Sequence, residues 1–183
     1  MATAPLPQDQ LQQNRRARIE IVDQHVRMEN AHDLDGVLAT FGKLAHYDDS
    51  PWNELHEGRE GVRNFYAELM RVVPDLSIEI VRRHVADETV LLEVMVRGTH
   101  LGTWRGLPAT GRRVEFPVCG VYSFNEDNSL AGEKIYYDRA TVLRQLGVFH
   151  EPETPLGRIT MMLTHPITIA RALLRGFRGG LQK

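Results

Sequence analysis

Residues 90–104 read VLLEVMVRGTHLGTW, and this stretch decides the fold class. Successive side chains of a strand point to opposite faces, so the even positions share one face and the odd positions share the other. The even set is Val90, Leu92, Val94, Val96, Gly98, His100, Gly102 and Trp104, whereas the odd set includes Glu93, Arg97, Thr99 and Thr103. This alternation is typical of a strand with one face on a core. His100 is therefore predicted to lie on an apolar wall.

Three further stretches have β-type sequences, and with the first they predict a four-stranded antiparallel meander. Residues 76–86 come before it, and the connection through Asp87 and Glu88 suits a hairpin. Residues 113–125 repeat the alternation of apolar even and polar odd positions, and residues 130–138 follow after a turn.

The first third of the chain has helical periodicity. Residues 11–30, 34–41 and 58–73 carry apolar side chains at the spacing of one buried helix face. Asp33 is predicted to cap the second helix, and Pro74 to end the third. Helices that precede a long antiparallel sheet indicate an α+β fold in which they cover one face of a curved sheet. A sheet covered in this way encloses a small-molecule pocket.

A length of 183 residues indicates one main domain with one principal site. Residues 1–14 are Pro- and Gln-rich and are expected to form a loose start. Residues 15–150 form the predicted α+β domain. Residues 151–183 form a C-terminal extension with one further helix, kinked at Pro166.

Composition excludes several classes of protein. The formal net charge of −2 gives no field that would collect nucleic acid. The single cysteine, Cys119, cannot form an internal disulfide, and no Cys/His spacing indicates a structural zinc site. The sequence contains no secretory signal and no apolar run of about 18 residues. We therefore expect a soluble cytoplasmic protein.

Strand parity suggests an ionisable group close to His100. If the register of residues 130–138 is unbroken and its even face turns inward, Lys134, Tyr136 and Asp138 enter the pocket. A carboxylate on an apolar wall is a candidate for proton transfer. The simpler alternatives are that Asp138 caps the following helix, that Lys134 extends into solvent, and that His100 is a core histidine bonded to a backbone carbonyl.

Residues 43–57 are predicted to be a short strand that runs into a polar and aromatic loop, and this stretch supplies further candidates. One of His46 and Asp48 is predicted to enter the pocket, Asp49 is assigned to the turn, and Trp52 is expected to act as a lid. No metal site is predicted, because neighbouring residues of one strand point apart. The predicted substrate contacts are His46, Asp48, Trp52, Trp104, Tyr122, Lys134 and Tyr136. The two tyrosines could equally be core aromatics with bonded hydroxyls.

Several short motifs together resemble the SnoaL-like polyketide cyclases. They are GVRNFY at 61–66, PDL at 74–76, GTHLG at 98–102, GLPATG at 106–111, Asp138, and QLG at 145–147. The resemblance spans about residues 20–147, and the combined pattern is specific to the family.

The resemblance implies the cone-shaped α+β barrel of the nuclear transport factor two-like superfamily, a homodimer, and a pocket that needs no cofactor. Family prototypes close a polyketide ring by intramolecular aldol addition. The resemblance implies that Asp138 is the general acid/base and that His100 holds the substrate or the developing enolate. The position four residues before this aspartate is commonly aromatic in the family, and here it is Lys134.

The main functional hypothesis is therefore an acid/base enzyme of the cyclase, lyase or isomerase type. Its substrate is expected to be a small, largely apolar carbonyl or hydroxyl compound, with Asp138 moving the proton and His100 polarising oxygen. One alternative is a binding or accessory protein that uses the same pocket without chemistry. Another is a hydratase or epoxide hydrolase that holds a water between Asp138 and His46.

Residues 156–183 combine an apolar stripe at helical spacing with basic residues and no acid. Such a segment could be an interfacial membrane helix. The alternative that we favour from sequence is that the stripe packs on its own domain or across a homodimer, so membrane contact is not expected.

Overall fold

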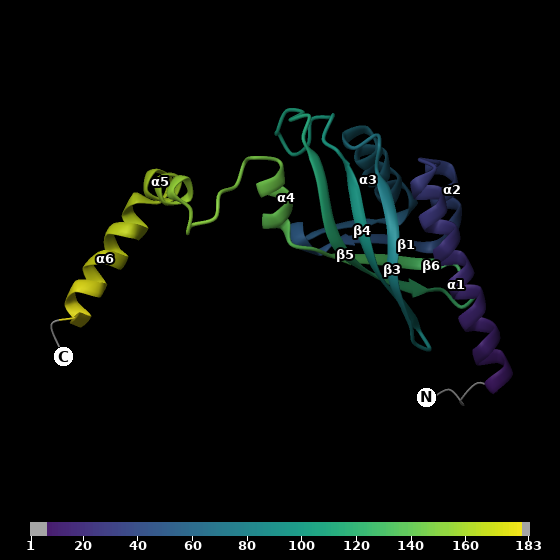
Figure 1. Ribbon diagram of the computed structural model, residues 1–183. Coiled ribbons are helices and arrows are strands. Elements are labelled where there is room, and N and C mark those ends of the chain that lie inside the picture. The colour runs from purple at the N-terminus through teal and green to yellow at the C-terminus, as the bar shows by residue number, and fades with distance from the viewer. Residues whose placement is uncertain (1–6, 181–183) are drawn as a thin grey trace. The chain divides into compact units, whose positions relative to one another are not determined.

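The computed structural model describes residues 7–180, and side chains within residues 7–175 (Figure 1). The chain forms two compact units, and the boundary falls between Val142 and Leu143. The sequence had placed the end of the α+β domain eight residues later.

Three predicted helices are present: the first two precede the sheet, and the third follows its first two strands. They are α1 (Gln8–Asn30), α2 (Leu34–Thr40) and α3 (Gly58–Val72). The Asp33 carboxylate caps α2 by accepting a hydrogen bond of 2.9 Å from the Gly36 amide. Helix α1 begins at Gln8, so residues 8–14 are helical rather than loose, and residues 1–6 lie outside the described part of the chain.

One curved sheet of six strands forms the other layer, so the fold is the predicted α+β class. Its strands are β1 (Phe41–Asp49), β2 (Glu54–Glu57), β3 (Ser77–Val85), β4 (Thr89–Thr99), β5 (Arg113–Phe124) and β6 (Leu130–Tyr136), in the order β2-β1-β6-β5-β4-β3. The predicted meander is β3 to β6, and β1 extends it by pairing in parallel with β6. Helix α1 contacts β3 and β4, while α3 contacts β1 and β2, so the helices cover one face (Figure 1).

The parity of β4 and β5 is confirmed. Val90, Leu92 and Val94 are buried on β4, and Val114 and Val118 are buried on β5. Their even positions pair across the two strands and form the wall of the core.

The parity of β6 is broken by a bulge. Ser123 pairs with Gly132 but Phe124 pairs with Leu130, so Ala131 is an extra residue. A bulge of one residue moves the following side chains to the opposite face. Glu133 is therefore buried, while Tyr136 is 48% exposed. The prediction that Lys134 and Tyr136 enter the core was wrong for this reason.

The second unit is helical in its described part. Helix α4 (Arg139–Gln145) spans the boundary between the units, and α5 (Pro155–Thr164) and α6 (Pro166–Gly180) follow. The expected single C-terminal helix is interrupted before Pro166, whose ring is disfavoured inside a helix. Among the described helices, none is both long enough and apolar enough to cross a bilayer.

Candidate active site

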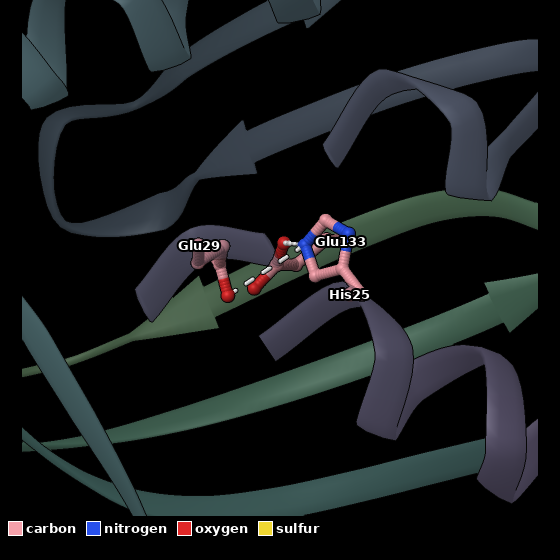
Figure 2. Close-up of side chains that lie close together, drawn as sticks. All are labelled: His25, Glu29 and Glu133. Carbon is pink, nitrogen blue, oxygen red and sulfur yellow. Dashed lines mark hydrogen bonds and ion pairs between the residues drawn. The ribbon is translucent and has the colours of Figure 1, made fainter. Parts of the chain in front are cut away.

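A network of polar side chains lies in the centre of the core. Glu133 on β6 accepts hydrogen bonds from the hydroxyls of Tyr66 (2.7 Å) and Tyr122 (3.0 Å), one on each carboxylate oxygen. The His25 Nε2 atom lies 3.2 Å from the same carboxylate and 3.8 Å from that of Glu29. Figure 2 shows His25, Glu29 and Glu133 converging from α1 and β6. All five side chains are buried, and we call them the deep network.

The hydrogen bonds of His25 indicate that both of its ring nitrogens are protonated. The Thr40 hydroxyl donates to the Val37 carbonyl, so it accepts from Nδ1 of His25 at 2.8 Å. The other nitrogen faces the Glu133 carboxylate. Burial lowers the pKa of His25, but the carboxylates of Glu29 and Glu133 outweigh this and raise it overall. Burial raises the pKa of Glu29 to about 7. The deep network therefore holds a buried imidazolium against Glu133.

The same cluster is the group with metal-ligand potential within residues 7–175. The donor atoms of His25, Glu29 and Glu133 all lie within 4.8 Å of one another. A metal there would have to displace the Nε2 proton of His25, because a metal ligand must be unprotonated. The Glu133 carboxylate already faces the protonated Nε2 of His25 and accepts hydrogen bonds from Tyr66 and Tyr122. The proton on His25 therefore balances the negative charge of Glu133 without a metal.

A second polar group lies around Asp49, the last residue of β1. Asp49 is 4% exposed, and its Oδ1 atom is buried without a hydrogen-bond partner. Burial raises the pKa of Asp49 to about 6, while Arg105 and a hydrogen bond from Tyr137 act in the opposite direction. A carboxyl with this pKa changes its protonation state close to neutral pH, as a general base must.

Aromatic and cationic side chains surround this carboxyl. The Trp52 indole N–H donates to the Tyr137 hydroxyl at 2.8 Å, and Trp52 meets Trp104 edge to face at 5.0 Å. The Arg105 guanidinium lies 4.2 Å from the centre of the Trp52 ring and 3.7 Å from the Asp49 carboxylate. Arg105 also pairs with Glu54 at 2.6 Å. Flat aromatic faces beside a titratable carboxyl suit an apolar ligand that carries one reactive polar group.

His100 lies next to Trp104 in this group of side chains. Its ring lies 6.5 Å from that of Trp104, and the residue is 2% exposed. The Thr110 amide donates to Nδ1 at 3.2 Å, so the neutral ring carries its proton on Nε2. Burial lowers the pKa of His100, which favours this neutral form. Nε2 is buried without a partner, so His100 offers one unused N–H donor. We call Asp49, Trp52, His100, Trp104, Arg105 and Tyr137 the mouth site.

The structure places the sequence-predicted residues in four locations. His100, Trp104 and Trp52 belong to the mouth site, and Tyr122 belongs to the deep network.

His46, Asp48, Lys134 and Tyr136 lie on the opposite face of the sheet. The buried positions of β1 are Ala45, Tyr47 and Asp49, so the two residues between them point outward. Asp48 pairs there with Lys134 at 2.7 Å. The prediction that His46 or Asp48 enters the pocket while Asp49 shapes a turn was therefore wrong, since Asp49 is the residue that turns inward.

Asp138 is exposed at the start of α4. Its two carboxylate oxygens accept from the amides of Ala140 (2.9 Å) and Thr141 (3.2 Å), and from the Thr141 hydroxyl at 2.5 Å. The expected burial of this carboxylate is not found, and the capping role that the sequence left open is present. Its predicted role in acid/base catalysis remains a prediction.

Sequence reasoning named Tyr122 but missed the rest of the deep network, and it missed the roles of Asp49, Arg105 and Tyr137. His25 and Glu29 follow the spacing of Val22 and Val26 on α1, so their burial was readable from helical periodicity. Glu133 was hidden by the bulge in β6. No parity rule placed Asp49, because the short strand β1 has no long apolar alternation.

Comparisons with known proteins agree with this fold. The family model described as SnoaL-like polyketide cyclase matches residues 19–146. The chain belongs to this family. Among curated proteins, no sequence matches the chain. The match ends at the close of α4, so the two C-terminal helices of this SnoaL-family protein lie outside the family model.

Solved structures similar to this SnoaL-family chain share its fold. AclR, a proposed hydroxylase from Streptomyces galilaeus, aligns with a TM-score of 0.65 at 20% identity over 89% of this chain and 98% of its own. A proposed SnoaL-like polyketide cyclase from a Jannaschia species aligns with a TM-score of 0.67 at 18% identity, over 79% and 97%. The epoxide hydrolase/cyclase-like enzyme SalBIII aligns with a TM-score of 0.58 at 18% identity, over 67% and 91%. These identities show the fold and not the reaction.

Proposed function

We propose that this SnoaL-family protein is an acid/base enzyme of the cyclase, lyase or isomerase type that requires no cofactor. Its substrate is a small, largely apolar carbonyl or hydroxyl compound. The observation that carries the proposal is Asp49, a buried carboxyl with one unpartnered oxygen and a pKa of about 6. An unsatisfied buried acceptor is costly to the fold, so it points to a group kept for a ligand.

The roles follow from the geometry of the mouth site. Asp49 takes a proton from the substrate carbon next to a carbonyl, or from a hydroxyl, and returns it later in the reaction. The Nε2 proton of His100 is a neutral donor for the substrate oxygen on which negative charge develops. Trp52 and Trp104 supply apolar side chains that contact the carbon skeleton, and the Arg105 guanidinium lies over both rings.

The family resemblance and the geometry of the mouth site favour different carboxyls as the base. The resemblance points to Asp138, and the geometry supports Asp49. Asp138 is exposed, and both of its oxygens accept hydrogen bonds from the first turn of α4. Asp49 has the burial and the raised pKa that proton transfer near neutral pH requires. The geometry therefore supports Asp49 as the base.

Deuterium exchange tests this assignment. β-Tetralone is an apolar aromatic ketone with acidic α-protons, and its deuteration in D₂O can be followed by proton NMR. We expect the wild-type protein to accelerate exchange, Asp49→Asn to lose at least about a hundredfold of that acceleration, and Asp138→Asn to stay within a few-fold of wild type. The reverse order of the two variants would assign the base to Asp138.

Binding is measured separately by tryptophan fluorescence. The chain has two tryptophans, and both belong to the mouth site, so quenching by β-tetralone reports occupation directly. Asp49→Asn is expected to bind the ketone about as well as wild type. Binding by the wild type with no exchange at any pH from 5 to 9 would support the alternative of a non-catalytic binding protein and refute the enzymatic proposal.

A further inference from the structure

The two C-terminal helices carry a large apolar surface that is not buried within their own unit. The hydrophobic core is built from side chains between Val22 and Ile135, together with partly buried neighbours of the same unit. In α5 and the described side chains of α6, seven large apolar residues are at least half exposed. They are Leu156, Ile159, Met162, Leu163, Ile167, Leu173 and Leu174, with exposed fractions from 50% to 75%.

The charge of this segment is one-sided. Residues 156–183 contain four arginines, one lysine and no acid, whereas the rest of the chain has 17 Lys and Arg against 24 Asp and Glu. The remainder therefore carries a net negative formal charge, which disfavours contact with an anionic surface, whereas this segment is attracted to one.

The basic and apolar residues are sorted around helix α6. At 100° per residue, Ile167, Ala170 and Leu174 fall within one arc, and Leu173 extends it. Arg171 and Arg175 are four residues apart and lie together on one flank of that arc. A helix with basic residues beside an apolar face is the arrangement of helices that lie in the plane of a membrane surface.

A lipid surface accounts for the exposed apolar residues and for the one-sided charge better than a second copy of the segment does. In an isologous pairing of two such helices, each apolar face would bring its arginines towards those of the partner, with no acid in residues 156–183 to neutralise them. Anionic headgroups neutralise the arginines while the acyl boundary takes up the apolar side chains.

We propose that α5 and α6 form an interfacial anchor that binds the protein to anionic lipid surfaces. The apolar residues of both helices insert at the acyl boundary, and Arg158, Arg171 and Arg175 contact headgroup phosphates. This inference does not depend on the proposed reaction at the mouth site.

Vesicle co-sedimentation of the full chain tests the anchor. The probes are vesicles of phosphatidylcholine alone and vesicles with phosphatidylglycerol added. We expect binding at least about tenfold tighter to the anionic vesicles, and weaker at high salt. Arg171→Glu with Arg175→Glu should weaken that binding at least about tenfold. The matched control is Arg16→Glu with Arg27→Glu on exposed positions of α1, which changes the net charge equally and should stay within about twofold of wild type.

Size-exclusion chromatography of the same proteins distinguishes a protein partner. The second variant, Leu173→Asp with Leu174→Asp, should lose vesicle binding while its elution volume matches that of wild type. Three results would overturn the proposal: no preference for anionic vesicles, equal loss in the α1 control, or a variant that changes from dimer to monomer while the wild type does not bind vesicles. The last result would assign the segment to a second copy of the chain.

Discussion

The deep network and the mouth site are two polar groups within one core, and they differ in how well their hydrogen bonds are satisfied. Glu133 accepts from two tyrosines and faces His25, and no side-chain atom of the deep network is left buried without a partner. The mouth site contains two such atoms, on Asp49 and His100. Buried polar groups in folded proteins are normally paired. The comparison supports a structural role for the deep network and the proposed ligand-binding role for the mouth site.

Stability and reactivity should therefore respond oppositely at the two places. A residue that serves the fold costs stability when it is removed, whereas a residue kept unsatisfied for a ligand can raise stability when it is replaced. The buried Tyr47 is influenced by both groups. Burial raises the pKa of its hydroxyl, and the negative charges of Glu133, Glu29 and Asp49 raise it further.

The largest effect is expected for Glu133→Ala. This change removes the nearer of the two carboxylates that face the His25 imidazolium, together with the acceptor of Tyr66 and Tyr122, so it should lower the free energy of unfolding by about 3 to 5 kcal/mol. Urea unfolding followed by circular dichroism measures it. Lys134→Ala is the matched control on the next residue of β6, because it removes an exposed ion pair with Asp48 worth about 1 kcal/mol or less. Equal losses in both variants would contradict the structural role of the network.

The opposite sign is expected for Asp49→Asn. The pKa of Asp49 is raised from 3.8 to about 6, so the folded protein binds this proton more tightly than the unfolded chain does. Ionisation then lowers stability as the pH rises from about 4 to about 6, and the full cost remains at pH 7.

Replacing the carboxyl with an amide removes that cost. Relative to wild type, Asp49→Asn should raise the free energy of unfolding by about 1 to 3 kcal/mol at pH 7 and have little effect at pH 4. Urea titrations of both proteins at the two pH values give the difference, and the titration of Glu29 cancels because both proteins contain it. A variant that is less stable than wild type at pH 7 would show that Asp49 serves the fold.

Sequence predicted the layers of this molecule better than its site, and particular residues show why. The long apolar alternation of β4 and β5 allows one parity, so the position of His100 was correct. In β6 the single extra residue Ala131 reversed every later assignment, and no local pattern announces a bulge. The inward position of Asp49 depends on the parallel pairing of β1 with β6, which is a contact between residues far apart in the chain.

The family resemblance has the same limit. It identified the family correctly, yet motifs report residue identity rather than exposure. Whether Asp138 or Asp49 is the buried carboxyl depends on the end of β1 and the start of α4, which sequence patterns do not place relative to each other.

The smallest expected effect concerns Arg105, which adjusts the mouth site without forming its core. Its guanidinium lowers the pKa of Asp49, so Arg105→Gln should raise that pKa and move the midpoint of the pH–rate profile for ketone exchange upward by as much as about one pH unit. Stability should change by about 1 kcal/mol or less, because the pair with Glu54 is partly exposed. Arg139→Gln is the control, since Arg139 also lies over the Trp52 ring, at 4.6 Å, but is not among the groups that shift the Asp49 pKa. A midpoint that moves equally in both variants would mean that loss of stacking on Trp52 governs the profile. A midpoint that moves only in Arg105→Gln ties the titration to Asp49, because electrostatic coupling to this carboxyl is what separates the two arginines.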